Sequence, residues 1–301
     1  MIKNIKNKRI AKYDNIKGLA IILIVLFHVS LPFSGHNIPA GILNMLMALG
    51  IPLFFFVSGY FSKVDENNTI NAFKRIFIPY IFFCTLWIIF NFLVLGGGIT
   101  DIPYFVPSRV LWYLLALFIM RLFLPIFVKI KHIWWIIFII AILISLIDIP
   151  KGFLALHRTL YYLPIFMLGY YFRNSDIYLN TVNSKFKSLI LKFKNIINNN
   201  KIIILIIFIL FIILMIFVFN NYSESFFTFN QSYKSLKISS TLGILMKLVS
   251  IIFSIIGVLI IVSLMTNKKT FLTKLGANSL AIYVLHPYFY WTLHKLFLTT
   301  S

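Results

Sequence analysis

Nine predominantly apolar runs, separated by short polar segments, follow one another along the 301-residue chain. A helix needs about 20 such residues to cross a bilayer, within a range of about 17 to 25. The runs therefore predict an all-α polytopic membrane protein, a bundle of about nine to ten transmembrane helices that forms a single integral-membrane domain over residues 1–301. The predicted spans are 16–33, 40–61, 75–95, 109–128, 133–149, 159–172, 201–219, 241–265 and 276–297.

The composition agrees with a membrane protein. Hydrophobic residues make up 60% of the chain and charged residues 12%, whereas about a quarter of a typical soluble domain is charged. The net charge of +21 comes with no nucleic-acid-binding or zinc motif, so we interpret it as basic flanks of membrane spans and expect no nucleic-acid partner. The single cysteine, Cys84, excludes an internal disulfide and a multi-cysteine metal site. We expect no metal.

The lysines and arginines predict the orientation. Cytoplasmic loops of membrane proteins carry an excess of these residues. Loops 34–39 and 96–107 contain neither residue, so they are expected outside. The N-terminus is then cytoplasmic, in a multi-pass protein of the plasma membrane in contact with membrane lipids. The basic segments that alternate with the outer loops are 3–17, 63–75, 129–131, 173–201 and 268–274.

One of these basic segments is long. Residues 184–200 place lysines around Phe186, Leu189 and Phe193 and are too polar to span. This pattern is typical of an amphipathic helix on the inner leaflet. We therefore predict a cytoplasmic basic amphipathic loop over residues 174–200, with a solvated basic linker as the alternative.

The first apolar run contains an ionisable residue. His28 follows Lys17 by eleven positions, which is about three helical turns and about 16.5 Å, so the two share a face. Asp14, three positions before Lys17, shares that face too. Ionisable groups inside a membrane are costly and normally face a cavity on a functional path. Histidine suits general-base catalysis on a hydroxyl; the alternative is a neutral His28 bonded to a neighbouring helix.

The stretch "YDNIKGLAIILIVLFHVS" resembles the first span of the membrane-bound acyltransferase family 3, which includes surface-polysaccharide O-acetyltransferases. A basic residue, ten intervening positions and a histidine are that family's pattern. Lys17 stands where arginine is common, and lysine keeps the charge without the planar fork of arginine. Further similar stretches, in the expected order, are "IPLFFFVSGYFSK", "FKRIFIPYIFF", "LWYLLALFIMRL", "YLPIFMLGYYF" and "NSLAIYVLHPYF".

The resemblance implies an O-acyltransferase that moves an acetyl or other acyl group from cytoplasmic acetyl-CoA to a hydroxyl of a cell-surface or exported glycan or glycolipid. It implies that His28 is the catalytic base and that Lys17 and Asp14 also belong to the catalytic residues. Asp14 either orients Lys17 or is a helix N-cap. If transfer to the final acceptor needs an extracellular partner, that partner is encoded separately.

Three cations are candidates for binding the phosphates of the donor: Lys74, Arg75 and Arg121. Lys74 and Arg75 open the third span at its cytoplasmic end, where the orientation rule alone would also place them. Arg121 falls inside the fourth span, so it either reaches the donor or extends to the inner leaflet.

Three residues are candidates for binding the acceptor: Arg158, at the predicted outer end of the sixth span, and Tyr283 and His286, on the last span. Tyr283 and His286 share a face of the last span, and either line the acceptor cavity or bond the helix backbone. Arg158 either binds an anionic glycan or is a boundary charge.

The sequence also leaves a different class of function open. Charged residues inside spans also suit a membrane translocator of a polysaccharide or small polar substrate. Matching inverted halves with broken helices would favour that alternative, and the sequence shows no such halves.

Overall fold

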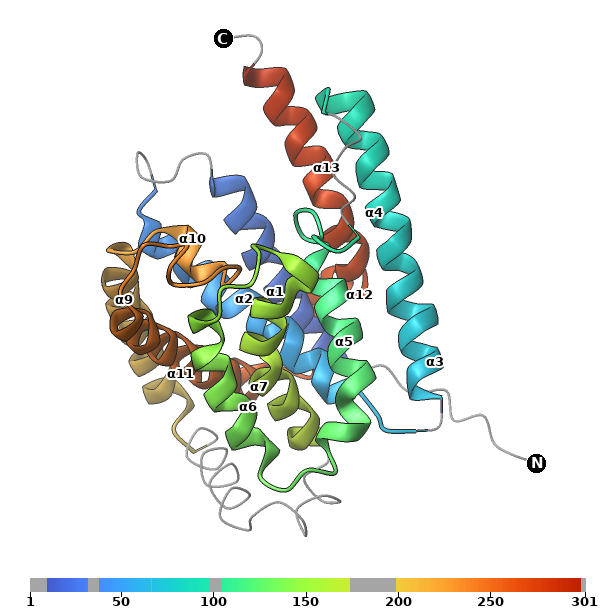
Figure 1. Cartoon of the computed structure of the whole chain (residues 1–301). Coiled ribbons are helices and arrows are strands. Elements are labelled where there is room, and N and C mark those ends of the chain that lie inside the picture. Colours follow the sequence, from blue (N-terminus) through green and yellow to red (C-terminus); the bar gives the residue numbers. More distant parts are fainter. Residues whose placement is uncertain (1–9, 32–37, 66, 98–103, 174–198, 299–301) are drawn as a thin grey trace, which may run out of the picture.

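The long apolar runs form helices, which pack as a bundle (Figure 1). The structure is a computed structural model that describes residues 10–31, 38–65, 67–97, 104–173 and 199–298. These residues contain helices and no strand, which confirms the all-α class. The loop predicted over 174–200 lies almost wholly outside the described residues.

A helix lies in each of the nine ranges predicted to span. Five of these helices are long and apolar enough to cross a membrane: α1 (Ala11–Ser30), α2 (Ala40–Phe61), the continuous helix Asn68–Leu95, α9 (Lys201–Asn220) and α11 (Ser240–Leu264). The number of membrane crossings therefore stays a prediction. The remaining long helices are α5 (Trp112–Phe127), α6 (Ile133–Leu143), α7 (Leu156–Arg173) and α13 (Ser279–Leu298).

The continuous helix Asn68–Leu95 begins seven residues before the predicted third span. It contains α3 (Asn68–Ala72), α4 (Ile78–Phe90) and two π-helical segments, η2 (Phe73–Phe77) and η3 (Asn91–Leu95). The apolar pattern missed its first turns because these are polar. The shorter elements elsewhere are η4 (Ile144–Leu146), η5 (Phe153–Ala155), α10 (Glu224–Phe227) and α12 (Phe271–Ala277).

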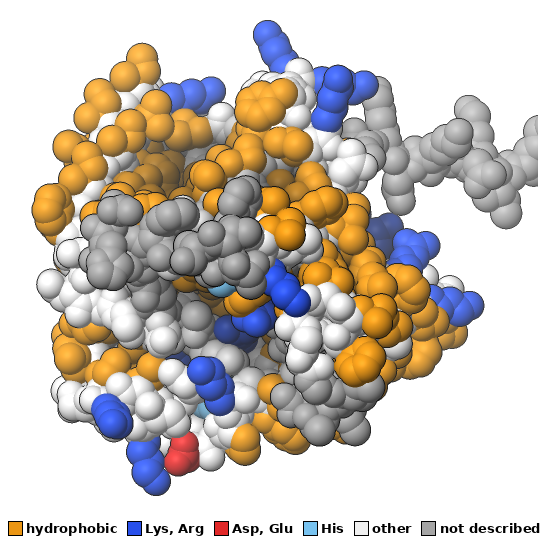
Figure 2. Space-filling view, turned by 90° about the horizontal axis from the view of Figure 1, so that it is seen from above, with side chains coloured by type: hydrophobic (Ala, Val, Ile, Leu, Met, Phe, Trp, Pro, Cys, Tyr) orange, Lys and Arg blue, Asp and Glu red, His pale blue; other side chains and the backbone are white. Residues whose placement is uncertain are grey.

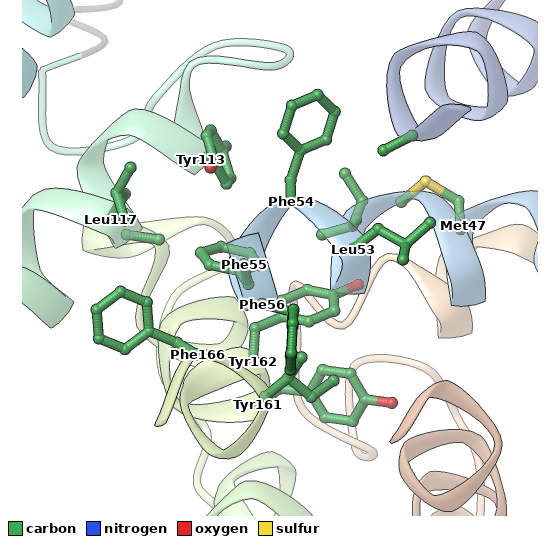
Figure 3. Packing of buried hydrophobic residues seen from close by; sticks show 14 of the residues in the cluster. Met47, Leu53, Phe54, Phe55, Phe56, Tyr113, Leu117, Tyr161, Tyr162 and Phe166 are labelled. Carbon is green, nitrogen blue, oxygen red and sulfur yellow. The ribbon is translucent and has the colours of Figure 1, made fainter. Parts of the chain in front are cut away.

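Helix α2 forms the centre of the bundle and packs against α1, α7, α9 and α11. Its aromatic side chains interdigitate with those of its neighbours, as the stacked rings of Phe55 and Tyr162 show at 5.0 Å (Figure 3). Two glycines allow α2 and α7 to approach closely. A Cβ at Gly59 would overlap the carbonyl oxygen of Phe166, and one at Gly169 would overlap that of Phe56. Small residues bring membrane helices together in this way.

The first turns of α1 are anchored by the segment that leads into α12. The side chain of Asn15 donates to the carbonyls of Thr266 at 3.1 Å and Lys268 at 2.9 Å. Its oxygen accepts from the hydroxyls of Thr270 and Thr273. The beginning of α1 is therefore fixed. This also fixes the direction of the helix axis and so the position of the later residues of α1.

Helix α9 presents much of its surface outward. Ile202 is 75% exposed and Phe217 71%, and half of the other apolar side chains of α9 are also exposed. Apolar surface on this scale does not face water in a stable protein. We therefore assign the outer face of α9 to lipid contact.

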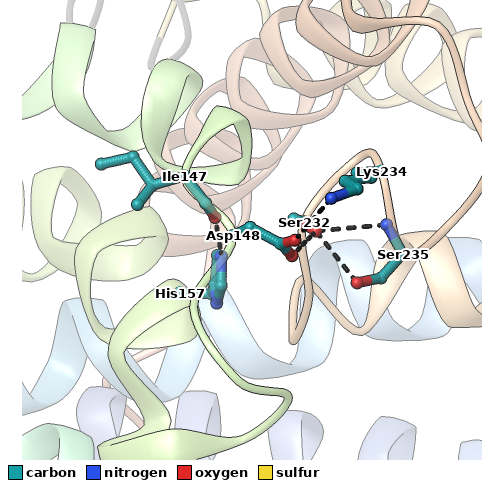
Figure 4. A network of polar contacts seen from close by, with 6 residues as sticks. All are labelled: Ile147, Asp148, His157, Ser232, Lys234 and Ser235. Atoms are coloured by element: carbon teal, nitrogen blue, oxygen red, sulfur yellow. Dashed lines mark hydrogen bonds and ion pairs between the residues drawn. The ribbon is translucent and has the colours of Figure 1, made fainter.

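Two loops are joined at the end of the bundle where α5 and α7 begin (Figure 4). Ser232 donates to Asp148 at 2.7 Å, and Lys234 forms an ion pair with the same carboxylate at 3.5 Å. A ring nitrogen of His157 donates to the carbonyl of Ile147 at 3.2 Å. These contacts hold the segment that follows α10 against the beginning of α7.

Candidate active site

A cavity of about 510 Å³ lies at one end of the bundle, where several helix ends converge. It is lined by the last turn of α1, the first half of α2, the residues that begin α5 and α7, the segment after α9, and α13. Figure 2 looks onto this end of the molecule and shows blue Lys or Arg and pale-blue His atoms set below the surrounding apolar surface. By the predicted orientation, this is the end away from the cytoplasm.

His28 lies in the last turn of α1 and lines the cavity. Its Nδ1 lies 2.8 Å from the carbonyl oxygen of Ile24. Because a carbonyl only accepts, Nδ1 carries the proton in this hydrogen bond, and in the neutral ring Nε2 keeps its lone pair. This is the tautomer that a general base requires.

His286 faces His28 from α13, with the two ring centroids 5.0 Å apart. Its Nδ1 donates to the carbonyl of Ile282 at 3.1 Å. Its Nε2 is buried and has no hydrogen-bond partner among the described residues. Both interpretations of His286 therefore apply, because the ring lines the cavity and also bonds its own backbone.

Tyr283, one turn before His286, is buried and also lines the cavity. Its hydroxyl donates to the carbonyl of Val110 at 2.6 Å, which ties α13 to the residues that begin α5. The hydroxyl proton of Tyr283 is used in this hydrogen bond, so the side chain stabilises the wall of the cavity.

Two arginines line the cavity and stack on tryptophans. Arg158, near the start of α7, donates from Nε to the carbonyl of Thr228 at 2.8 Å, and its guanidinium lies 4.5 Å from the ring of Trp112. The guanidinium of Arg109 lies 4.0 Å from the ring of Trp291. Such contacts orient a guanidinium and leave its remaining N–H groups for a ligand.

The other two residues predicted to be catalytic lie at the opposite end of α1. Lys17 Nζ forms an ion pair with Asp14 Oδ1 at 2.7 Å. The N-cap of α1 is Ile10, and no side chain caps this end, so the interpretation of Asp14 as an N-cap is wrong. Asp14 instead holds Lys17. The structure does not bring this pair into the cavity with His28.

The predicted donor-binding cations lie along α5 and the π-helical segment η2, away from the cavity. Lys74 and Arg75 are exposed in η2, which packs against α5. Arg121 on α5 interacts electrostatically with Arg75, and its Nε is buried without a hydrogen-bond partner among the described residues. Two guanidiniums that lack a carboxylate in this part of the structure suit an anion such as a phosphate group.

A line of hydroxyl and aromatic groups lies between the two regions. The hydroxyls of Ser58 on α2 and Tyr113 on α5 are 2.8 Å apart. The Tyr113 ring lies 5.3 Å from that of Tyr283 at the cavity, and its hydroxyl interacts electrostatically with Arg121. The residues proposed for donor and acceptor are thus connected through α5.

One of the sequence comparisons identifies the family of the chain. The chain matches the acyltransferase domain of acyltransferase family 3 over residues 10–301. The chain belongs to this family. A search of curated proteins and a search of solved structures each found no match. Together with the five long apolar helices, the family makes the chain an integral-membrane acyltransferase in general terms.

Among the ionisable cavity residues of this acyltransferase, the sequence analysis missed Arg109, Tyr290 and His294. Arg109 offered a signal, because it is an arginine at a predicted outer end, against the usual distribution of positive charge. His294 lies eight positions after His286, a spacing that returns to a similar face of the helix. Among the described residues, no group of three His, Cys, Asp or Glu side chains could hold a metal ion.

Proposed function

We propose that the protein is an O-acyltransferase that moves an acetyl or other acyl group from cytoplasmic acyl-CoA to a hydroxyl of a cell-surface or exported glycan or glycolipid. His28 is the general base. The observation that carries the proposal is the His28 ring, whose Nδ1–H is held by the Ile24 carbonyl at 2.8 Å and which lines the cavity of about 510 Å³.

In the proposed reaction, Nε2 of His28 accepts the proton of the acceptor hydroxyl while the hydroxyl oxygen attacks the carbonyl carbon of the thioester. The new carbon–oxygen bond forms, the carbon–sulfur bond breaks, and the proton passes from the imidazolium to the sulfur of the departing coenzyme A. General-base catalysis of this kind typically contributes about 10²–10⁴-fold to the rate. His286, whose ring centroid is 5.0 Å from that of His28, is the group best placed to interact with the imidazolium.

The donor is proposed to bind from the cytoplasmic side. Arg75 and Arg121, together with the exposed Lys74 beside them, are proposed to contact its phosphates, because guanidinium groups bind phosphate oxygens in pairs. Lys17, held by Asp14 at 2.7 Å, supplies a further cation at the inner end of α1. The acceptor is proposed to bind at the outer end, against Arg158, Tyr283 and His286.

The test is acetyl-CoA turnover by the purified full-length protein in lipid nanodiscs, with and without a glycan acceptor. We expect His28→Ala to lower turnover by about 100-fold or more, because the variant lacks the base. Val29→Ala is the matched control, since Val29 is the next residue on α1 and is 47% exposed. Its turnover should equal that of the unmodified protein.

Normal donor turnover by His28→Ala would show that the role given to His28 is wrong. Transport of an unmodified polysaccharide or small polar substrate across the bilayer, independent of acyl-CoA, would instead support a translocator and contradict acyl transfer.

A further inference from the structure

The cavity is strongly basic. Among its described lining residues are two arginines and three histidines, and no aspartate or glutamate. We propose, resting on the function above, that the acceptor is an anionic saccharide, with a phosphate or carboxylate group close to the reacting hydroxyl, and that Arg109 and Arg158 bind this anion.

Arg158 has the geometry of an anion-binding residue. Its Nε donates to the Thr228 carbonyl at 2.8 Å and its guanidinium stacks on Trp112 at 4.5 Å, so its direction is fixed. It forms no ion pair with a carboxylate among the described residues. Arg158 is partly buried and lines the cavity, and its two terminal nitrogens can bind phosphate or carboxylate oxygens in a bidentate manner.

Arg109 reaches the same cavity from the residues before α5. Its guanidinium lies 4.0 Å from the ring of Trp291 and 5.7 Å from that of Trp87. Its backbone is in the left-handed region, with φ of 53°, which costs about 1–2 kcal/mol for a residue with a Cβ. Strained backbone of this kind is concentrated at functional sites. The stacking and the backbone together fix a second cation at the cavity.

The proposed chemistry also favours a negative charge in the cavity. Arg109, Arg158 and His28 line the same cavity, so the two guanidinium groups share it with the proposed base. When His28 takes the proton of the acceptor hydroxyl, its imidazolium develops next to these two positive charges, and like charges disfavour the protonated ring. An anion held by Arg109 and Arg158 offsets this repulsion during proton transfer. A neutral acceptor would leave three positive charges together.

The position of the cavity distinguishes the acceptor from the donor as the source of the anion. Its lining residues include the last turn of α1, Met47 and Ile51 in the middle of α2, and the beginnings of α5 and α7. The predicted cytoplasmic loops join the opposite ends of these helices. The phosphates of a cytoplasmic acyl-CoA are therefore expected near Arg75 and Arg121, and the anion at Arg109 and Arg158 belongs to the acceptor.

The experiment compares three acceptors that share one sugar ring: glucose, glucuronic acid and glucose 1-phosphate. Transfer from acetyl-CoA is measured with the full-length protein in phosphatidylcholine nanodiscs. We expect kcat/KM to be at least about tenfold higher for the charged sugars, as charge-assisted hydrogen bonds typically provide. In Arg109→Gln and Arg158→Gln this preference should fall about tenfold or more, chiefly through KM for the acceptor.

Lys151→Gln and Lys237→Gln are the matched controls, because both lysines are exposed in loops at the same end of the bundle and neither lines the cavity. Their charge preference should be unchanged. Quenching of tryptophan fluorescence by each sugar, without donor, measures the same preference as a binding constant. This second measurement tests the proposal even where turnover is slow.

Equal use and equal binding of all three sugars would overturn the proposal. So would an arginine variant that raised KM for acetyl-CoA alone, because the arginines would then bind the donor. Competition by phosphatidylglycerol in the nanodisc, lost in the arginine variants, would assign the anion to a lipid headgroup and also overturn it. Acetyl-CoA turnover without charge preference contradicts only this inference, whereas absence of turnover with any acceptor contradicts the proposed acyltransferase reaction.

Discussion

At the scale of single residues, the site depends on how two imidazoles use their nitrogens. His28 and His286 each donate from Nδ1 to a carbonyl of their own helix, at 2.8 and 3.1 Å. Each neutral ring therefore keeps Nε2 as its acceptor. The two residues share a bonding pattern but differ in burial, since Nε2 of His286 is buried without a partner among the described residues. We infer that His286 acts on the reaction through His28.

We expect His286→Ala to lower kcat by about 10- to 100-fold, less than the about 10²–10⁴-fold that a general base itself contributes. Since His286 acts through His28, the double variant His28→Ala/His286→Ala should be no slower than His28→Ala alone. The measurement is a double-mutant cycle on acetyl-CoA turnover. Losses that multiply in the double variant would mean that His286 acts independently of His28.

Four ionisable residues of the cavity could be predicted because such a side chain within or at the end of an apolar run is conspicuous. His28, Arg158, Tyr283 and His286 were all selected in this way, and all line the cavity. Arg109 was missed, although it opens the predicted span 109–128 much as Arg158 precedes the span 159–172. The separation of Lys17 from the cavity follows from the length of α1, whereas the approach of His286 to His28 depends on how α13 packs against α1.

At the scale of helices, the hydrophobic pattern located the elements well and their ends less well. The predicted span 40–61 coincides with α2. The predicted span 75–95 lost the polar first turns of the helix Asn68–Leu95. Hydropathy indicates which residues prefer lipid. A helix continues beyond these residues wherever its backbone hydrogen bonds can form, so its ends need not coincide with those of the apolar run. The close crossing of α2 and α7 needed the structure, which identifies Phe166 as the residue opposite Gly59.

We expect Gly59→Ala and Gly169→Ala to destabilise the protein by about 1–3 kcal/mol each, because overpacking a tight contact forces backbone shifts. Each new methyl would overlap a carbonyl oxygen of the opposing helix. Gly50→Ala is the matched control on α2. There the added Cβ would lie 3.1 Å from Ile24 Cγ1 and 3.2 Å from Leu23 Cβ, side-chain atoms that can shift.

Thermal unfolding in detergent measures the effect. Gly59→Ala and Gly169→Ala should melt several degrees below Gly50→Ala. Equal melting temperatures for all three variants would show that the α2–α7 crossing tolerates a larger separation.

At the scale of the whole molecule, the two sets of cations fall at different ends of the bundle. Arg109 and Arg158 lie at the cavity, while Lys17, Lys74 and Arg75 lie toward the ends that carry the basic loops. Which of the two ends faces the cytoplasm stays a prediction from the distribution of positive charge. Sequence alone could not show that the outer ends of α1, α2, α5, α7 and α13 meet around one cavity. That convergence depends on side-chain packing between distant segments.

This division predicts which residues can be labelled from each side of the membrane. The single cysteine, Cys84, is buried, so Cys84→Ala gives a background for new cysteines with little other change. Ser225 lines the cavity, and Lys129 is exposed after α5, at the opposite end. In intact cells, a membrane-impermeant maleimide should label Ser225→Cys at once and Lys129→Cys only after permeabilisation. Labelling of Lys129→Cys from outside would reverse the orientation. The cavity would then face the cytoplasm, where its arginines could meet the phosphates of acyl-CoA and an exported acceptor could not reach His28.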